Sequence, residues 1–476
     1  MNDCYKFLLD TVKNKDCAVL GLGVSNLPLV RLLLSFDVCK SLTVYDKKRV
    51  DELGEDALAL SQQGVHFAVG FDNIRADVIF RTPGIRPDID GIEKCVKEGA
   101  VLTSEMESFL ATTPARVFGI TGSDGKTTTT TLTGKFLETG NGSGKTYVGG
   151  NIGTPLLDKC GMMRDDDCAV LELSSFQLMT FKKAPICSAI TNLSPNHMDW
   201  HTDEAEYAAA KHNIVGKETR RVVLNAECAH TYEYGCELIA EGGREIIFFS
   251  SRAECYGDVF EDVKDNVKLI FVRDGKITLS DGRSDETLLD CKSIKIPGKH
   301  NIENYMTAIG LTYGFVNTDV YECVASEFYG VEHRLELVRR KDGVDYFNSS
   351  IDSSPTRTLA ALSALDGRDI VAICGGYDKN LSYNILAKKL CESVRAVVVT
   401  GAAANKIKKA IDECDDYPQS GLKVFMEDTF EGAVSRAASQ GREGGCVVLT
   451  PACASFDRFK NFAERGRYFK ELVNSL

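Results

Sequence analysis

The chain of 476 residues is long enough for about three domains that each bury a core. Its hydrophobic fraction of 43% and charged fraction of 26% are typical of a globular protein. A net charge of −12 without a long basic run argues against a nucleic-acid partner, and no apolar stretch approaches the roughly 18 residues of a membrane helix. The charged first residues do not resemble a signal peptide, and the 17 scattered cysteines do not suggest disulfides, so we expect a cytoplasmic protein.

A first α/β segment begins with a predicted buried strand over residues 17–24, which contains Gly21 and Gly23. A second strand ends in Asp46 about 20 residues later, where dinucleotide folds place a carboxylate that binds ribose. Asn26 stands where the third glycine of that fingerprint belongs. The incomplete fingerprint therefore predicts a Rossmann-like fold in which NAD is only one of several candidate ligands.

A phosphate loop with the sequence T-G-S-D-G-K-T follows the predicted strand at residues 117–120 and precedes a predicted helix that ends near Glu138. The glycines let backbone amides turn toward an anion, Lys126 supplies a charge for phosphates, and the Thr127 hydroxyl can bind Mg²⁺. Ile120 replaces the first glycine of the standard spacing. The alternative, an ordinary strand–helix turn with a surface lysine, leaves the two glycines unexplained, so the loop predicts nucleotide binding.

Glu172 interrupts an apolar strand predicted over residues 168–173. A buried carboxylate is costly unless it is paired or bound to a metal, so Glu172 is a candidate ligand of the Mg²⁺ that the phosphate loop requires. The alternative is an outward-facing glutamate on an edge strand.

Two further residues have chemistry that depends on their neighbours. His197 follows a predicted strand at 186–191 and lies on a loop, because Pro195 excludes a helix there. Lys211 lies in a helix predicted over residues 205–215, and periodicity alone makes it a solvated lysine.

Short β-like runs among turns occupy residues 222–295, and a third α/β segment begins near residue 331, with polar loops at 375–379 and 451–462. We therefore predict an α/β fold of three domains. They are a Rossmann-like N-terminal domain over residues 1–108, a P-loop-type central ATPase domain with a mixed sheet over 109–330, and a Rossmann-like C-terminal domain over 331–476.

Several motifs occur together and in a fixed order along the whole chain. They are the phosphate loop, G-G-N-I-G at 149–153, L-E-L-S-S-F-Q-L at 171–178, N-x-x-x-x-H-M-D at 192–199, a helix lysine at 211, H-N at 300–301, H-R at 333–334 and P-A-C-A-S-F-D-x-F-K-N-F at 451–462. This series resembles the Mur ligase family.

The resemblance implies an ATP-dependent, amide-bond-forming ligase of peptidoglycan synthesis, and hence a role in cell-wall growth, cell shape and division. ATP would phosphorylate the carboxylate of UDP-N-acetylmuramoyl-L-alanine, and the amine of D-glutamate would attack the acyl phosphate through a tetrahedral intermediate. The resemblance also implies a monomer that uses ATP and two Mg²⁺ ions.

The resemblance further implies a role for each matching residue. Catalytic residues would be Lys126, His197 and Lys211, and metal ligands would be Thr127, Glu172, His197 and a carbamate on N6-carboxylated Lys211. ATP contacts would be Gly122, Ser123, Asp124, Gly125, Lys126, Thr127, Thr128, Asn301, Asn304 and Arg334. Contacts of the uridine nucleotide would be Ser25, Asp46, Lys48 and Gly84, and Asn151 would contact the muramoyl-alanine part. Those of D-glutamate would be Lys379, Ser455 and Phe462, and Ser174 and Phe456 would be further substrate-binding residues.

Three positions depart from the family pattern. Asp124 stands where many relatives carry Asn, and Ser349 and Ile351 stand where many carry an Asp that contacts ATP and a Lys. Either Asp352 takes over the missing carboxylate or ribose binding is weaker.

Other functions explain less of the sequence. A sister ligase with another amino acid, or a folylpolyglutamate synthase, is the nearest rival, but the residues at 25 and 46 and the loop at 451–457 favour uridine nucleotide and D-glutamate. An NAD-dependent oxidoreductase would leave the phosphate loop unused. A non-catalytic nucleotide-binding regulator is supported only by Ser349 and Ile351.

Overall fold

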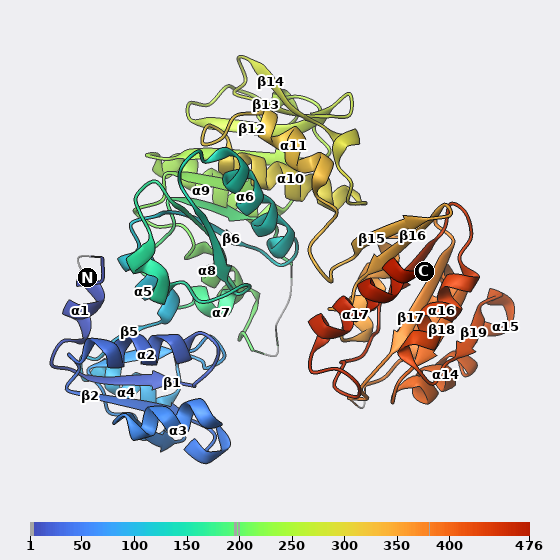
Figure 1. Cartoon of the computed structure of the whole chain (residues 1–476). Helices are drawn as coiled ribbons and strands as arrows, with labels where there is room; N and C mark the ends of the chain where they lie inside the picture. Colours follow the sequence, from blue (N-terminus) through green and yellow to red (C-terminus); the bar gives the residue numbers. More distant parts are fainter. Residues whose placement is uncertain (1–3, 195–197, 199, 380) are drawn as a thin grey trace. The chain divides into compact units, whose positions relative to one another are not determined.

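The computed structural model of the chain describes residues 4–194, 198, 200–379 and 381–476. Contacts divide the chain into two compact units, the first formed by Met1–Ser293 and Lys299–Val324, the second by Ile294–Gly298 and Ala325–Leu476. Figure 1 shows two sheets in the first unit and one in the second. No helix in the described part of the chain has the length and apolar character needed to cross a membrane.

The first sheet has five parallel strands in the order β3-β2-β1-β4-β5. Its strands are β1 (Asp16–Leu20), β2 (Ser41–Asp46), β3 (His66–Val69), β4 (Val78–Arg81) and β5 (Val101–Thr103). The accompanying helices are α1 (Lys6–Val12), α2 (Asn26–Phe36), the short η1 (Val50–Glu52), α3 (Glu55–Gln62), α4 (Asp90–Lys97) and α5 (Glu105–Thr112). The strand order reverses between β1 and β4, and open sheets of this kind bind ligands at the carboxyl ends of the strands beside such a point.

The second sheet has nine strands in the order β14-β13-β12-β11-β10-β9-β6-β8-β7. Its strands are β6 (Arg116–Thr121), β7 (Thr146–Gly150), β8 (Cys168–Glu172), β9 (Cys187–Ile190), β10 (Arg221–Asn225), β11 (Glu245–Ser250), β12 (Val267–Arg273), β13 (Lys276–Ser280) and β14 (Asp285–Asp290). The helices are α6 (Lys126–Gly140), η2 (Leu157–Met162), α7 (Ser175–Leu178), α8 (Glu204–His212), α9 (Ala229–Glu241), η3 (Tyr256–Asp258), η4 (Cys291–Ser293), α10 (Lys299–Thr312) and α11 (Asp319–Glu327). The sheet is mixed, as predicted for the central segment, because β12, β13 and β14 pair antiparallel.

The second unit has a six-stranded sheet in the order β15-β16-β20-β17-β18-β19, parallel except for β15. Its strands are β15 (Glu336–Lys341), β16 (Val344–Asn348), β17 (Ile370–Gly375), β18 (Ala396–Thr400), β19 (Lys423–Met426) and β20 (Cys446–Leu449). Its helices are α12 (Pro355–Ser363), α13 (Asn384–Ser393), α14 (Ala404–Asp412), α15 (Tyr417–Ser420), α16 (Phe430–Gln440) and α17 (Phe462–Ser475). The prediction of an α/β fold built on largely parallel sheets is therefore confirmed.

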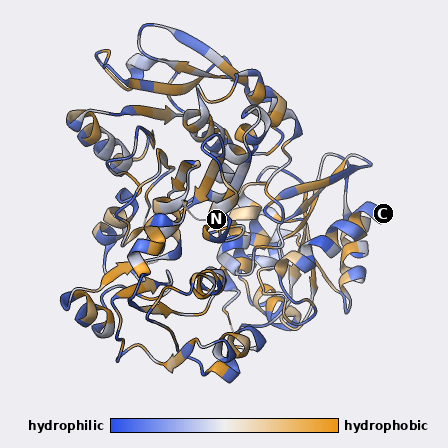
Figure 2. Cartoon of the chain, turned by 60° about the vertical axis from the view of Figure 1, so that its left-hand side comes forward, coloured by the Kyte–Doolittle hydropathy of each residue, from blue (hydrophilic) through white to orange (hydrophobic). Residues whose placement is uncertain are grey.

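Apolar residues concentrate in the strands, which are mostly orange in Figure 2. Parallel strands covered on both faces read as continuous apolar runs, and β1, β8, β17 and β18 are buried along almost their whole length for this reason. No disulfide joins the cysteines in the described part of the chain, and the exposed cysteines are Cys236, Cys255 and Cys323, all in the first unit.

Candidate active site

The phosphate loop runs from the end of β6 to the start of α6, and two glycines give it its shape. Gly122 and Gly125 have φ angles of 145° and 81°. A Cβ atom on Gly122 would lie 1.9 Å from Thr191 Oγ1, and one on Gly125 would lie 2.4 Å from Asn304 Oδ1, so both positions require glycine. Because α6 begins at Lys126, its first-turn amides face this loop, as in helix N-termini that bind phosphate.

Two lysine side chains bind the same carbonyl group of the phosphate loop. Lys126 Nζ donates to the carbonyl oxygens of Gly122 and Ser123, each at 2.9 Å. Lys211 Nζ donates to the carbonyl oxygen of Gly122 at 2.7 Å and to the Thr121 hydroxyl at 3.4 Å. Two amines thus converge on one end of the loop, where they could face an anionic ligand.

The interpretation of Lys211 as a solvated lysine is wrong. Its side chain is 2% exposed, and its Nζ lies 4.7 Å from the centre of the Tyr207 ring. Burial, and then the neighbouring Lys126, hold the pKa of Lys211 well below its usual value. The site therefore favours the neutral, nucleophilic form of this amine.

Glu172 ends β8, which lies between β6 and β7 and is not an edge strand. The residue is 2% exposed, so the alternative of an outward-facing glutamate is wrong. Its Oε1 accepts a hydrogen bond from Asn151 Nδ2 at 2.9 Å, whereas its Oε2 is buried without a hydrogen-bond partner among the described residues. An orphaned, buried carboxylate oxygen beside a phosphate loop fits a hard cation such as Mg²⁺.

The remaining predicted metal ligands are less well defined. His197 lies outside the described residues. Thr127 lies half-buried in the first turn of α6, together with Thr128. Within residues 4–194, 198, 200–379 and 381–476, no three His, Cys, Asp or Glu side chains are grouped as a metal site. The predicted ligands that the structure does bring to the loop are therefore Thr127, Glu172 and Lys211.

The residues after β9 and the first turns of α10 both contact the phosphate loop or the start of α6. The backbone amides of Ser123 and Asp124 donate to the carbonyl and side-chain oxygens of Asn192, at 2.9 and 3.0 Å. From α10, Asn304 accepts a hydrogen bond from Thr129 Oγ1 at 3.3 Å and donates to Asn301 Oδ1 at 3.0 Å. Asn304 therefore lies against the loop, and Asn301 contacts Asn304.

Sequence reasoning missed Tyr207. Its hydroxyl lies 2.8 Å from Ser123 Oγ, so it connects α8 directly to the phosphate loop. Tyr207 precedes Lys211 by one helical turn, and this spacing, which places both on one face, was the available signal.

Predicted nucleotide-binding residues follow three neighbouring strands of the first sheet. Ser25 follows β1, Asp46 ends β2 and Gly84 follows β4. The Asp46 carboxylate accepts hydrogen bonds from the backbone amides of Leu22 at 2.9 Å and Lys48 at 3.1 Å, and so joins the ends of β1 and β2. The set therefore lies at the carboxyl edge where the strand order reverses.

Asn26 explains the missing third glycine. Its Nδ2 donates to the carbonyl oxygens of Leu20 and Gly21, at 3.1 and 2.8 Å. These hydrogen bonds close the turn between β1 and α2, and a glycine, which has no side chain, could not make them.

Asn151 and Ser174 lie near the Glu172 strand end, but their side chains have different roles. Asn151 is exposed, with its amide group bound to Glu172 as described. Ser174 is the N-cap of α7, and its hydroxyl donates to Gln177 Oε1 at 2.9 Å.

In the second unit, the predicted amino-acid-binding residues follow β17 and β20. Lys379 is exposed and Ser455 is buried, and the backbone amide of Tyr377 donates to the Ala454 carbonyl at 2.9 Å, which joins the two loops. The rings of Tyr377 and Phe456 meet edge to face with centroids 6.2 Å apart. Phe462, at the start of α17, is exposed.

Arg465 on α17 holds the backbone of the loop after β20, and sequence reasoning missed this residue. It is buried, and its guanidinium donates to the carbonyl oxygens of Ser350 at 2.8 Å and of Cys453 and Ala454 at 3.1 Å each. Burial lowers its pKa to about 10. A charged residue on the apolar stripe of a helix was the only sequence signal.

Arg334 lies on a tight turn of the second unit that Ser349 supports. The flanking residues His333 and Leu335 have φ angles of 64° and 48°, in the left-handed region. The Leu335 amide donates to Ser349 Oγ at 3.1 Å. Ser349, one of the departures from the family pattern, thus shapes the turn that carries Arg334.

Asp352, three residues after Ser349, is buried. Its Oδ2 accepts a hydrogen bond from Thr450 Oγ1 at 3.0 Å. Burial raises the pKa of Asp352 to about 6, although Ser349, Thr450 and two arginines act in the opposite direction.

We expect Asp352→Asn to stabilise the second unit by about 1–3 kcal/mol near pH 8. The folded-state pKa of about 6 exceeds the ordinary value of 3.8, so the folded chain binds more protons between these values and loses stability as pH rises through them. The gain should vanish below about pH 4. Urea denaturation across this range measures it, with exposed Asp415→Asn as the control; an equal gain at both ends would contradict the assignment.

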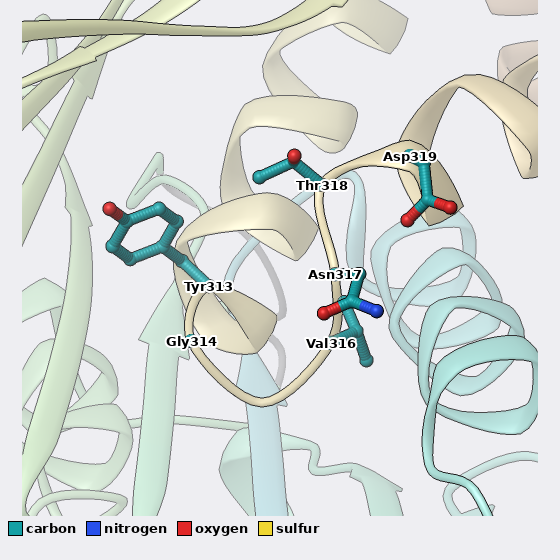
Figure 3. Close-up of a pocket in the computed structure, with 6 residues that line it drawn as sticks. All are labelled: Tyr313, Gly314, Val316, Asn317, Thr318 and Asp319. Atoms are coloured by element: carbon teal, nitrogen blue, oxygen red, sulfur yellow. The ribbon is translucent and has the colours of Figure 1, made fainter.

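A surface hollow follows the end of α10, and Figure 3 shows the residues that line it. A Cβ on Gly140, the last residue of α6, would lie 2.6 Å from Val316 in this hollow, whereas the phosphate loop precedes the first residue of α6. The helix between them is about 22 Å long, so the hollow is separate from the candidate active site. Its lining residues are Tyr313, Gly314, Val316, Asn317, Thr318 and Asp319.

Two family models match the chain. The Mur ligase middle domain matches residues 120–312, and the model described as Mur ligase, glutamate ligase domain matches residues 333–453. The first match contains the phosphate loop, Glu172 and Lys211, and the second contains Arg334 and Lys379.

Similar proteins match over the whole chain. This chain is 42% identical over 487 residues to the UDP-N-acetylmuramoylalanine--D-glutamate ligase of Ruminiclostridium cellulolyticum. It is 41% identical over 482 residues to the ligase of the same name from Clostridium novyi, and both comparisons cover 100% of each chain. Among solved structures, a UDP-N-acetylmuramate-alanine ligase from Thermotoga maritima matches with a TM-score of 0.54 and 17% identity, covering 97% of this chain and 99% of its own. That similarity supports the fold alone.

Proposed function

The chain belongs to the Mur ligase family, and we infer that it is the ATP-dependent ligase that adds D-glutamate to UDP-N-acetylmuramoyl-L-alanine in peptidoglycan precursor synthesis. The observation that carries this inference is the end-to-end identity of more than 40% with ligases of that name. The phosphate loop and its buried lysine and glutamate supply the chemistry that such a reaction needs.

The reaction has two steps. The substrate carboxylate attacks the γ-phosphorus of ATP, which forms an acyl phosphate and releases ADP. The D-glutamate amine then attacks the acyl carbon, and the tetrahedral intermediate expels phosphate as the amide forms. Phosphoryl transfer depends mainly on position and on charge neutralisation.

The phosphate loop and Lys126 would hold the phosphates of ATP. Lys126 donates to two carbonyl groups of the loop, and this attachment of its ammonium group to the loop supports the assignment. Asn301 and Asn304 would bind ATP beside the loop, and Arg334 of the second unit stays a predicted phosphate contact.

Two Mg²⁺ ions would be held by Thr127, Glu172, His197 and modified Lys211. When bound, Mg²⁺ neutralises charge on the transferring phosphoryl group. The orphaned Oε2 atom of Glu172 supports this assignment.

Lys211 would be N6-carboxylated. Its neutral amine would add to CO₂ and lose a proton, and the resulting carbamate would provide an anionic oxygen ligand. The depressed pKa and the enclosed position of the amine support this modification.

The substrate contacts follow the same division as the sheets. Ser25, Asp46, Lys48 and Gly84 would bind the uridine nucleotide, Asn151 and Ser174 the muramoyl-alanine part, and Lys379, Ser455, Phe456 and Phe462 the D-glutamate. The three domains at 1–108, 109–330 and 331–476, a monomeric state and a cytoplasmic location belong to the same proposal.

The test is phosphate release from ATP by the pure protein with Mg²⁺ and UDP-N-acetylmuramoyl-L-alanine, comparing D-glutamate with L-glutamate, L-alanine and meso-diaminopimelate. Release that requires both the nucleotide substrate and D-glutamate is the expected result. Release with a different amino acid would reassign the second-unit pocket, and no release with any would revive a binding role.

We expect Lys379→Ala to raise the KM for D-glutamate by about 10- to 100-fold, because a lysine bound to a carboxylate is worth about 1.5–3 kcal/mol. The KM for ATP should stay within about twofold, since ATP makes no contact with this lysine in the proposal. Steady-state kinetics measure both, and exposed Lys423→Ala of the same unit is the control. An unchanged KM for D-glutamate would remove Lys379 from the pocket.

A further inference from the structure

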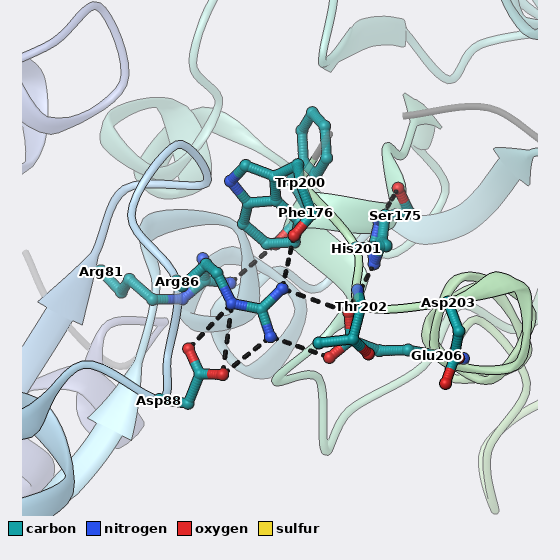
Figure 4. A network of polar contacts seen from close by, with 10 residues as sticks. All are labelled: Arg81, Arg86, Asp88, Ser175, Phe176, Trp200, His201, Thr202, Asp203 and Glu206. Atoms are coloured by element: carbon teal, nitrogen blue, oxygen red, sulfur yellow. Dashed lines mark hydrogen bonds and ion pairs between the residues drawn. The ribbon is translucent and has the colours of Figure 1, made fainter. Parts of the chain in front are cut away.

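We propose that Arg86 and Glu206 are positioning residues that hold the loop after β4 against α8, so that the bound nucleotide substrate presents its carboxylate to the phosphate loop. The Arg86–Glu206 contact is called the clasp below. The inference rests on the proposed function, in which Gly84 contacts the nucleotide and Lys211 lies at the reacting centre. Figure 4 shows the polar network that joins these parts of the first unit.

The loop after β4 is fixed from within by Arg81. This buried guanidinium donates to the carbonyl oxygens of Pro83 at 3.2 Å and Ile85 at 2.6 Å, and to that of Phe176 on α7 at 2.7 Å. Gly84 lies between the first two of these residues. The backbone on both sides of Gly84 is therefore held by Arg81, which also connects it to α7.

Arg86 connects the same loop to the segment before α8. Its guanidinium makes a bidentate pair with Glu206, at 2.8 and 3.2 Å, and donates to the Trp200 carbonyl at 2.6 Å. The other edge binds Asp88 through Nε at 2.9 Å and Nη2 at 2.7 Å. Each of the three guanidinium nitrogens thus has an acceptor, and Nε is shared between both Asp88 oxygens. The five N–H donors of arginine are all used, which a lysine could not reproduce.

Glu206 joins this loop to both α7 and α8. It lies in the first turn of α8, and its Oε2 accepts hydrogen bonds from the Thr202 amide at 3.0 Å and lies 3.1 Å from His201 Nδ1. The other ring nitrogen of His201 lies 2.9 Å from the Ser175 hydroxyl of α7. The carboxylate is therefore a junction between three segments that are distant in sequence.

Helix α8 carries this connection on to the phosphate loop. Tyr207, the next residue, reaches Ser123 at 2.8 Å, and Lys211 reaches the Gly122 carbonyl at 2.7 Å. A continuous series of contacts thus runs from the Gly84 loop to the phosphate loop. Misplacement of reacting groups by about 1 Å can cost about 100-fold in rate, so such a connection bears directly on turnover.

The Arg86–Glu206 pair is more shielded than an ordinary surface ion pair. Its side chains are 22% and 24% exposed, whereas those of Lys183 and Glu218, a surface pair of the same unit at 3.3 Å, are 46% and 43% exposed. The hydrogen bond from Arg86 lowers the pKa of Glu206 to about 2, so the pair stays ionised at any pH used for assay. The surface pair does not touch the Gly84 loop and serves as a matched control.

The experiment compares Arg86→Met, Arg86→Lys and Glu206→Gln with the wild type. We expect the Met and Gln variants to raise the KM and the Kd for UDP-N-acetylmuramoyl-L-alanine by about tenfold or more, while the KM for ATP changes by less than about twofold. Arg86→Lys should give an intermediate value, because it keeps the charge and loses the fork. The double variant Arg86→Met/Glu206→Gln should bind the nucleotide no more weakly than the more impaired of the two single variants, because both substitutions remove the same contact.

Glu218→Gln should leave all these constants unchanged. Unaltered nucleotide constants in Arg86→Met and Glu206→Gln would overturn the clasp, as would an equal rise in the KM for ATP, which indicates general loosening. If Arg86→Met does not fold, Arg86→Lys and Glu206→Gln decide alone. The Kd is measured without ATP or D-glutamate, so this test of the clasp does not depend on turnover. A wild-type chain that binds the nucleotide but does not turn over would contradict the proposed function, and the effect of the variants on the Kd could still be measured.

Discussion

Lys126→Ala should lower D-glutamate-dependent phosphate release by about 10²–10³-fold. The lysine is the phosphate-loop cation, and its Nζ is already aligned by two loop carbonyl groups, so its position is fixed before ATP binds. Removal takes away charge that stabilises the phosphoryl group in the transition state more than in the ground state, so kcat should fall more than the KM for ATP rises.

Lys135→Ala on the exposed face of the same helix is the matched control and should keep full activity. Because Lys126→Ala also leaves two loop carbonyl groups without this donor, thermal unfolding of both variants is recorded beside the kinetics. A folded Lys126→Ala protein with wild-type turnover would remove the phosphate-loop assignment.

Lys211→Ala should also lose about 10²–10³-fold in activity, and a high concentration of formate or acetate should restore part of it. The reason is steric as well as chemical: alanine leaves an enclosed space beside the Gly122 carbonyl, where a small carboxylate can replace the missing carbamate. Lys211→Met fills that space with a chain of similar length, so it should be equally inactive and not rescued.

Lys217 is exposed, and Lys217→Ala serves as the control. This variant should keep wild-type activity, and added formate or acetate should not change that activity. In the wild type, labelled CO₂ should give a carbamate carbon resonance by nuclear magnetic resonance that is missing from both Lys211 variants. A fully active Lys211→Ala protein, or equal rescue of the Ala and Met variants, would contradict the carbamate role.

The parts of the site that the sequence predicts are those whose geometry is local. A strand, two glycines at positive φ and a helix start lie within a few residues of one another, so the phosphate loop could be placed without knowledge of the fold. Glu172 was likewise identified because a carboxylate in an apolar strand is unusual wherever the strand lies.

Features that depend on tertiary packing could not be found in this way. Lys211 is buried only because α8 lies against the phosphate loop, and periodicity within one helix does not contain that information. The short β-like runs over residues 222–295 look uninformative singly, yet β10 to β14 form five of the nine strands of the second sheet. Arg86 and Glu206 are far apart in the sequence, and neither belongs to a motif.

The distribution of thiols has a practical consequence for watching this protein at work. Burial raises the pKa of Cys446 and Cys453 to about 11, which keeps these thiols protonated and unreactive, and the exposed cysteines all belong to the first unit. Alkylating reagents should therefore modify Cys236, Cys255 and Cys323 first. With these three replaced by serine and one of them restored, a single cysteine added to the surface of the second unit would give a pair of fluorophore attachment points. Energy transfer between them would test whether the distance between the units changes when substrates bind.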